Sequence, residues 1–263
     1  MSDLVTAYRV IVVDLHTHVL PGLDDGARHL DEAIEMVRTM AQDGIRVVAA
    51  TPHVRDDYPT TPDQMEAALG LLQAAVEAAG IEIDLRGGGE VAISALGDLD
   101  AAALARFGLG GNPQLLLLEM PYYGWPLSLS HQCERLLRSG VVPVLAHPER
   151  NTSVATHTRE LADLVRSGVV VQLTAAAVDG RLGRSAASLA RHLLDLELAH
   201  LISSDAHSPE VREAGLSAAA TKVGGDLGHW LTSAAPAALL AGAPLPRRPA
   251  AKRRPFRRGR LGR

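Results

Sequence analysis

The sequence predicts a single α/β barrel built from alternating strands and helices. Short apolar, β-rich runs recur along the 263 residues, and a segment with helical spacing follows each of them. The runs are nearly continuously apolar rather than alternating, as expected for strands that are buried on both faces. No long linker separates the repeats, which favours one barrel, and a doubly wound open sheet is the alternative.

Seven strands are expected from these runs. Apolar residues in the segments between them recur with the 3.6-residue period of a helix, and several of these segments end in Gly, as helix C-termini often do. In either fold, functional residues gather at the C-terminal ends of the strands. The seven runs are Arg9–Val13, Arg46–Ala50, Glu82–Arg86, Leu115–Glu119, Val141–Ala146, Val169–Leu173 and His200–Ser203.

The composition is that of an ordinary globular protein, with 47% hydrophobic and 21% charged residues. No apolar run reaches 18 residues, so no transmembrane helix is expected. The first residues lack a basic segment followed by a long apolar one, so we expect no signal peptide. Cys133 is the one cysteine, which excludes an internal disulfide and fits a cytoplasmic location.

The charge is distributed unevenly along the chain. Residues 247–263 hold nine of the 26 basic residues and no acidic ones, which leaves the rest with 17 basic against 30 acidic residues, a net charge of −13. An acidic body argues against nucleic-acid binding by the barrel. We therefore expect a barrel over residues 1–240 and a basic, disordered tail over 241–263 that could contact acidic surfaces.

Residues that can bind metal ions stand where the predicted strands end. Asp14-Leu15-His16-Thr17-His18 follows the first run, and alternate residues on a strand point the same way, so His16 and His18 can face one ion. Asp205 and His207 repeat this spacing after the last run. Only five of the 11 histidines lie at strand ends, and we expect the other six to be surface or capping residues.

Nine residues are therefore candidate metal ligands, which is too many for one ion and suits two or three. Their mixture of imidazoles and carboxylates favours Mn, Fe or Zn over Ca or Mg. Three divalent ions would outweigh the four carboxylates, and the excess positive charge would attract a phosphate dianion. The nine are His16, His18, Asp25, His53, Glu90, Glu119, His147, Asp205 and His207.

Two arginines could complete a phosphate site, because the planar guanidinium suits phosphate oxygens. Arg150 follows His147 by three residues and Arg212 follows His207 by five, and a surface salt bridge is the alternative role for each. Cys133 lies in a helical segment without the C-x5-R spacing, so a cysteine phosphatase is not expected. The triglycine Gly87–Gly89 is expected to let the backbone approach the metals closely.

These motifs resemble the PHP (polymerase and histidinol phosphatase) superfamily. The opening string from Asp14 to Ala27, DLHTHVLPGLDDGA, is similar to that of the bacterial CpsB/CapC-type protein-tyrosine phosphatases of capsule and exopolysaccharide loci. The later motifs follow in family order, and the resemblance spans roughly residues 10–235. Those motifs are ATPH ending at His53, GEV at Glu90, LEMP at Glu119, LAHPER ending at Arg150 and SSDAHS around Asp205.

The resemblance implies a distorted (β/α)7 TIM-like barrel, the PHP fold, with three metal ions, most commonly Mn²⁺. It implies that a metal-activated hydroxide hydrolyses phosphotyrosine monoesters, and that Arg150 and Arg212 bind the phosphate. The expected partner is a tyrosine-phosphorylated kinase that regulates polysaccharide synthesis. By matching motif, His16, His18, Glu90 and Asp205 would hold one ion, Glu90, Glu119 and His147 a second, and Asp25, His53 and His207 the third.

Two features bear on the substrate. The stretch Thr174–Val178 departs from the family pattern after the sixth strand, so a changed pocket wall is expected there. Tyr122, Tyr123, Trp125 and Tyr58 are grouped near the expected mouth of a chain with only 3% aromatic residues, and Tyr122 and Tyr123 are the candidate substrate-binding residues. The alternatives are a small-molecule phosphatase resembling histidinol phosphatase, a nuclease-like module and a regulatory module without activity.

Overall fold

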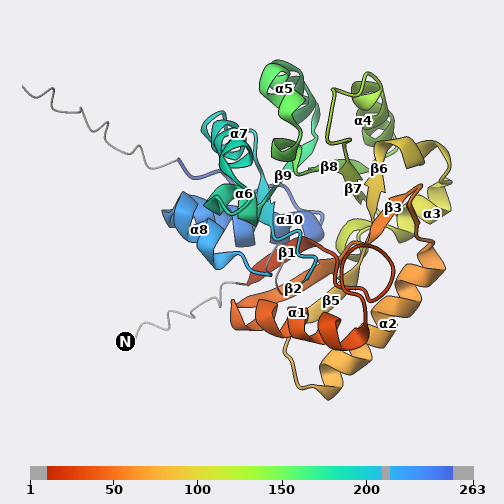
Figure 1. Cartoon of the computed structure of the whole chain (residues 1–263). Coiled ribbons are helices and arrows are strands. Elements are labelled where there is room, and N and C mark those ends of the chain that lie inside the picture. Colours follow the sequence, from red (N-terminus) through yellow and green to blue (C-terminus); the bar gives the residue numbers. More distant parts are fainter. Residues whose placement is uncertain (1–10, 209–213, 251–263) are drawn as a thin grey trace, which may run out of the picture.

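The computed structural model describes residues 11–208 and 214–250, and Figure 1 shows helices packed around a central set of strands. The predicted seven runs are present, with bounds that shift by a few residues, and further short strands accompany them. The strands are β1 (Val12–Thr17), β2 (Ile45–Ala50), β3 (His53–Arg55), β4 (Tyr58–Pro59), β5 (Asp84–Gly87), β6 (Glu90–Ala92), β7 (Leu115–Glu119), β8 (Val142–Ala146), β9 (Val170–Thr174) and β10 (Leu201–Ser203).

Two of the seven barrel positions are each filled by two consecutive short strands. β2 is followed by β3 after Thr51 and Pro52, and β5 is followed by β6 after Gly88 and Gly89. The first halves pair in parallel in the order β1-β2-β5, and the second halves join the order β10-β9-β8-β7-β6-β3-β4. All of these pairs are parallel except the β3–β4 pair, which is antiparallel.

Hydrogen bonds between the first and the last strand segments join the two sheets into a ring. The Asp205 N–H donates to the His16 carbonyl at 2.9 Å, and the His18 N–H donates to the Ala206 carbonyl at 2.9 Å. Thr17 and Ala206 also form a parallel bridge. An open doubly wound sheet would not bring its first and last strands together in this way, so the predicted barrel is confirmed and the alternative is excluded.

The helices begin and end at residues that satisfy their backbone groups. Thr61 and Gln64 form a capping box at the start of α2, with Pro62 in the first turn, and Gly168 ends α5 in the left-handed conformation. The α-helices are α1 (Leu30–Gln42), α2 (Pro62–Ala78), α3 (Ala101–Arg106), α4 (Leu129–Arg138), α5 (Thr158–Ser167), α6 (Ala175–Asp179), α7 (Arg184–Asp195), α8 (Ser217–Val223), α9 (Gly225–His229) and α10 (Ala235–Leu240).

Short helical turns fill several connections. The stretch from Ser94 to Gly108 has helical spacing but forms two segments, η1 and α3, because the Asp100 carboxylate accepts a hydrogen bond from the Ala103 N–H and starts a new helix. The turns are η1 (Ile93–Gly97), η2 (Leu109–Gly111), η3 (Pro148–Arg150), η4 (Thr152–Thr156) and η5 (Trp230–Ala234).

The apolar residues form an outer and an inner core. The outer core lies between strands and helices, and the inner one fills the barrel with alternate strand residues such as Leu15, Leu117 and Val144. Leu109 from η2 and Leu239 from α10 complete the inner core. No helix within residues 11–208 and 214–250 has both the length and the apolarity needed to cross a bilayer.

The predicted first strand, Arg9–Val13, was placed too early, since β1 runs from Val12 to Thr17 and Arg9 lies outside the described residues. His16 is therefore inside a strand rather than after it. The start of the predicted tail packs on the barrel: the Trp230 indole donates to the Pro246 carbonyl at 3.0 Å, and Arg248 donates to the Ala199 carbonyl. The division at residue 240 stays a prediction, and residues 251–263 lie outside the described part.

Candidate metal centre

All nine candidate ligands meet at one end of the barrel, in four overlapping groups. Within each group the ligand atoms lie within 4.8 Å of one another. Every member has a buried side chain except Asp25, which is 42% exposed. The groups are His18, Asp25, His53 and His207; His16, His147 and Asp205; His16, His18 and Glu90; and His53, Glu90 and Glu119. We call these nine residues the metal-ligand cluster.

Glu90 lies at the middle of the cluster. Its Oε2 is 3.3 Å from His16 Nε2, 3.4 Å from His18 Nε2 and 2.8 Å from His53 Nδ1, and its Oε1 is 2.8 Å from His147 Nε2. Burial alone would raise the pKa of this carboxyl, but the facing histidines hold it well below its usual range. Glu90 is therefore an anionic centre shared by four imidazoles, as a bridging ligand would be.

Irregular backbone turns some of these side chains into the barrel mouth. Leu15 and Ala146 face the inner core, so the next residues, His16 and His147, would face outward on regular strands. The pairing of β1 with β2 shifts register between Asp14 and Thr17, and His147 adopts the left-handed conformation with φ 32°. Asp205 is also left-handed, with φ 52°. Such strained backbone outside glycine is typical of functional sites.

The loop after β1 explains the Asp24-Asp25-Gly26 sequence. Asp24 Oδ2 accepts hydrogen bonds from His18 Nδ1 at 2.7 Å and from the His53 N–H at 2.9 Å, while Asp25 Oδ1 lies 3.4 Å from His53 Nε2 and 3.3 Å from His207 Nε2. A Cβ on Gly26 would lie 2.1 Å from the His18 carbonyl oxygen, so only glycine fits. One aspartate orients a histidine and the other joins the cluster.

Sequence reasoning missed two residues that orient ligands. Asp24 is one, and Gln172 on β9 is the other: Gln172 Oε1 accepts from the His16 ring at 3.1 Å and from the His147 N–H at 3.2 Å. The Gln172–His16 and Asp24–His18 hydrogen bonds each occupy Nδ1 of the histidine and leave its Nε2 facing the cluster, as in the outer contacts of metal-bound histidines. A polar residue in the otherwise apolar run VVQL was the available signal for Gln172.

Two arginine–tyrosine pairs flank the cluster. Arg150 donates to Asp205 Oδ2 at 2.6 Å and to the Tyr122 hydroxyl at 3.2 Å, and Tyr122 stacks on His147. On the other side Arg55, which sequence reasoning missed, donates to Glu119 Oε2 at 3.3 Å and lies over the Tyr58 ring, which stacks on His53. Each pair therefore connects a cation to the cluster.

Other expected residues lie elsewhere. Tyr123 is 83% exposed, and Trp125 stacks on His157. Arg212 lies outside the described residues. The side chain of Cys133 is buried, which raises the pKa of its thiol to about 12, in keeping with the expectation that it is no nucleophile.

The triglycine makes its close contacts with packed residues. A Cβ on Gly89 would lie 2.6 Å from Phe107 Cδ1, so packing against Phe107 requires glycine here, and the expected close approach of this backbone to metals stays a prediction. The stretch Thr174–Val178, which departs from the family pattern, is buried at the junction of β9 and α6. The Thr174 N–H donates to Glu149 Oε1 at 2.7 Å.

The donor set fits divalent cations. Glu119 Oε1 is buried and accepts no hydrogen bond from any donor in the described residues, and Glu90 Oε2 is buried with imidazole nitrogens at 2.8 Å to 3.4 Å. Buried carboxylate oxygens of this kind are costly unless a cation lies beside them. Five imidazoles with four carboxylates are the ligands that Mn, Fe and Zn prefer. The residues present therefore suit a site for more than one metal ion.

Known proteins that resemble this chain are tyrosine phosphatases of a capsule-synthesis family. The family model described as capsular polysaccharide synthesis, CpsB/CapC, matches residues 12–235. The chain is 30% identical over 202 residues to the tyrosine-protein phosphatase YwqE of Bacillus subtilis (strain 168), covering 76% of this chain and 79% of that protein. It is 23% identical over 210 residues to the tyrosine-protein phosphatase CpsB of Streptococcus pneumoniae, covering 76% and 85%.

A solved structure shares the fold. It comes from work described as crystal structures of YwqE from Bacillus subtilis and CpsB from Streptococcus pneumoniae, unique metal-dependent tyrosine phosphatases. The TM-score is 0.83 at 29% identity, and the match covers 90% of this chain and 97% of that one. The resemblance inferred from the sequence motifs is confirmed.

Proposed function

This chain belongs to the CpsB/CapC family of capsular polysaccharide synthesis, and on that basis we propose that it is a metal-dependent phosphatase that hydrolyses phosphotyrosine in proteins. The observation that carries the proposal is the metal-ligand cluster, in which nine buried or half-buried imidazoles and carboxylates meet at the barrel mouth. The cluster lies beside Arg150, which can bind phosphate oxygens.

The cluster has enough ligands for three divalent ions, and its mixed donors suit manganese, iron or zinc, of which the family resemblance favours manganese. Such ions would neutralise phosphoryl oxygens and lower the pKa of water at the site. Asp25, His53 and His207, which the resemblance assigns to one ion, lie together in a group that also holds His18, and Glu90 lies in two of the other groups. His147 lies both beside Glu90 and with His16 and Asp205.

The chain's own residues orient the reacting groups. Gln172 and Asp24 fix the rings of His16 and His18, so that no free energy is spent on turning them. The Arg150 guanidinium is held by Asp205 and by the Tyr122 hydroxyl and ring, in a position to receive phosphate oxygens at the edge of the cluster. Tyr122 also offers an aromatic face to the substrate ring.

The family points to a partner. We propose that the substrate protein is a tyrosine-phosphorylated kinase of polysaccharide assembly and that the enzyme acts in the cytoplasm, a proposal that membership of a capsular polysaccharide family supports. The acidic barrel gives no electrostatic reason to bind nucleic acid.

The test is phosphate release from a phosphotyrosine peptide by metal-stripped protein, with and without added Mn²⁺. We expect activity only with metal and a loss of at least about 100-fold in His147→Ala, because Glu90 and the rest of the cluster lose a shared neighbour. His192→Ala, an exposed histidine on α7, is the control and should retain activity. A wild-type protein that binds metal but releases no phosphate from the peptide would contradict the substrate class.

A further inference from the structure

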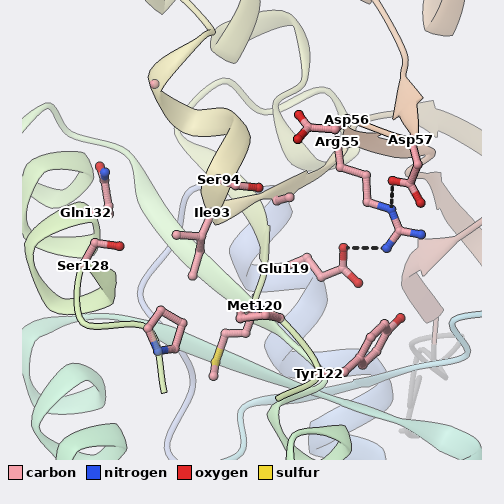
Figure 2. Close-up of a pocket in the computed structure, with 14 residues that line it drawn as sticks. Arg55, Asp56, Asp57, Ile93, Ser94, Glu119, Met120, Tyr122, Ser128 and Gln132 are labelled. Carbon is pink, nitrogen blue, oxygen red and sulfur yellow. Dashed lines mark hydrogen bonds and ion pairs between the residues drawn. The ribbon is translucent and has the colours of Figure 1, made fainter. Parts of the chain in front are cut away.

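A pocket adjoins the metal-ligand cluster and extends away from it (Figure 2). It has a volume of about 600 Å³ and shares Glu119 with the cluster and Tyr122 with the Arg150 site. Figure 2 shows Gln132 and Ser128, from α4 and its start, on the side opposite Arg55 and Asp57, with Glu119 between them. The pocket therefore leads from the cluster towards α4.

The pocket is larger than its position beside the phosphate site requires. Pockets of roughly 300–1,000 Å³ are typical of sites that bind a whole drug-sized ligand. A phosphotyrosine whose phosphate is at the cluster needs only the part next to Glu119 and Tyr122. The space towards Ser128 and Gln132 remains for atoms joined to the tyrosine, on the side of its main chain.

The chemistry of the far part suits polypeptide. Ile93, Met120 and Pro126 supply apolar surface, and Gln132 Oε1 is buried without a hydrogen-bond donor in the described residues. The amide oxygen has almost no accessible surface, so the Gln132 side chain must turn towards the pocket to accept a ligand N–H, and the hydrogen bond that it then gains lowers the free energy of binding. A main-chain N–H beside an apolar side chain meets both features.

The charged residues of the pocket argue against a second phosphate there. Arg55 is its one cation, and Glu119 and Asp57 hold the guanidinium at 3.3 Å and 2.8 Å. Asp56 and Asp57 add acidic side chains at the exposed side. An anionic group would therefore be repelled, because it would meet three carboxylates and a single cation that is already paired with two of them.

We propose that this pocket binds the residue next to the phosphotyrosine in a polypeptide substrate, taking an apolar side chain against Ile93, Met120 and Pro126 and a main-chain N–H at Gln132 Oε1. The inference rests on the proposed phosphatase function and deepens it. It makes α4 and η1 the elements that distinguish a phosphorylated protein from a small phosphate ester.

The experiment compares kcat/KM for two substrates of the Mn²⁺-loaded full chain. One is p-nitrophenyl phosphate, which has no neighbouring residue, and the other is a phosphotyrosine peptide with leucine on both sides of the tyrosine. Gln132→Ala removes the acceptor, and Ser128→Trp fills the far part of the pocket. The matched controls are Gln114→Ala, at the opposite end of the barrel before β7, and Ser130→Trp, exposed on the same helix as Gln132.

We expect Ser128→Trp to lower kcat/KM for the peptide by about tenfold, and Gln132→Ala to lower it by about tenfold or less. Both variants should hydrolyse p-nitrophenyl phosphate within about twofold of the wild-type rate. Both controls should behave as the wild type. Equal rates on the peptide in wild type and both variants, or an equal loss for both substrates, would overturn the pocket assignment while leaving the phosphatase function standing. Failure of the wild type on both substrates would instead refute the proposed function.

Discussion

Asp24 should control metal affinity without being a ligand. Its carboxylate collects three donors: His18 Nδ1 at 2.7 Å, the His53 N–H at 2.9 Å and the Gly26 N–H at 2.9 Å. Asp24→Asn keeps the shape, but its amide nitrogen must face one of these donors. Burial alone would raise the pKa of Asp24, yet His18 and the two N–H groups lower it to about 2.

That pKa sets the size of the effect. A fall from 3.8 to about 2 corresponds to about 2.5 kcal/mol favouring the charged form in the folded protein. Because the folded-state pKa is lowered, this contribution is complete above pH 3.8 and is lost only as the pH falls towards 2. At pH 7 the Asn variant should therefore lack most of it. Metal binding should weaken by 10- to 100-fold, roughly, for a separate reason, because His18 loses the carboxylate that orients its ring.

The assay is a Mn²⁺ titration of metal-stripped protein against a competing chelator at pH 7, combined with the Mn²⁺ dependence of phosphate release. Asp31→Asn, an exposed aspartate at the start of α1, is the control. If Asp24→Asn binds Mn²⁺ within about twofold of the wild type, the His18 ring does not depend on this carboxylate and the reasoning is refuted.

Two further changes test the loop after β1 and the last barrel strand. Gly26→Ala should weaken metal binding and lower the free energy of unfolding by about 1–3 kcal/mol, because its Cβ would lie 2.1 Å from the His18 carbonyl oxygen; Gly70→Ala on α2, where nothing lies within 4 Å, should instead stabilise the protein slightly in the same urea titration. Burial lowers the pKa of His200 to about 4, so the unfolded chain takes up the proton first as the pH falls. Stability should therefore drop between about pH 6.5 and pH 4 by up to about 3 kcal/mol. His200→Asn, which can still accept the Val171 N–H bond, should flatten that stretch of the stability curve, and an unchanged slope would contradict the assignment.

The barrel and the nine-residue cluster could be predicted because both follow from local patterns. Apolar runs mark the strands, and parallel strands bring their carboxyl ends together, so residues as distant as His16 and His207 meet without any knowledge of the contacts. The bounds of the first strand were less accessible. His16 belongs to β1, but its buried polar side chain interrupts the apolar pattern that marks a strand, so the sequence pattern placed the end of the strand too early.

The split of two barrel positions was not visible in the sequence. Pro52 lacks an N–H, and Gly88 and Gly89 have no side chain to continue the apolar pattern. In the sequence, the breaks at these residues therefore resemble the ends of strands. His53 and Glu90 therefore begin β3 and β6 rather than follow β2 and β5. Arg55 was missed for a related reason, because its partner Glu119 is 64 residues away and only the folded chain brings them together.

Closure of the ring through Thr17 and Ala206 has a consequence for protein synthesis. His16 and His18 leave the ribosome long before Asp205 and His207, which emerge only after nearly all the other barrel strands. A nascent chain that stops before β10 holds seven of the nine cluster residues and lacks the strand that completes the ring. Truncated or stalled chains are therefore without a complete metal centre, and the full centre forms only in a finished barrel.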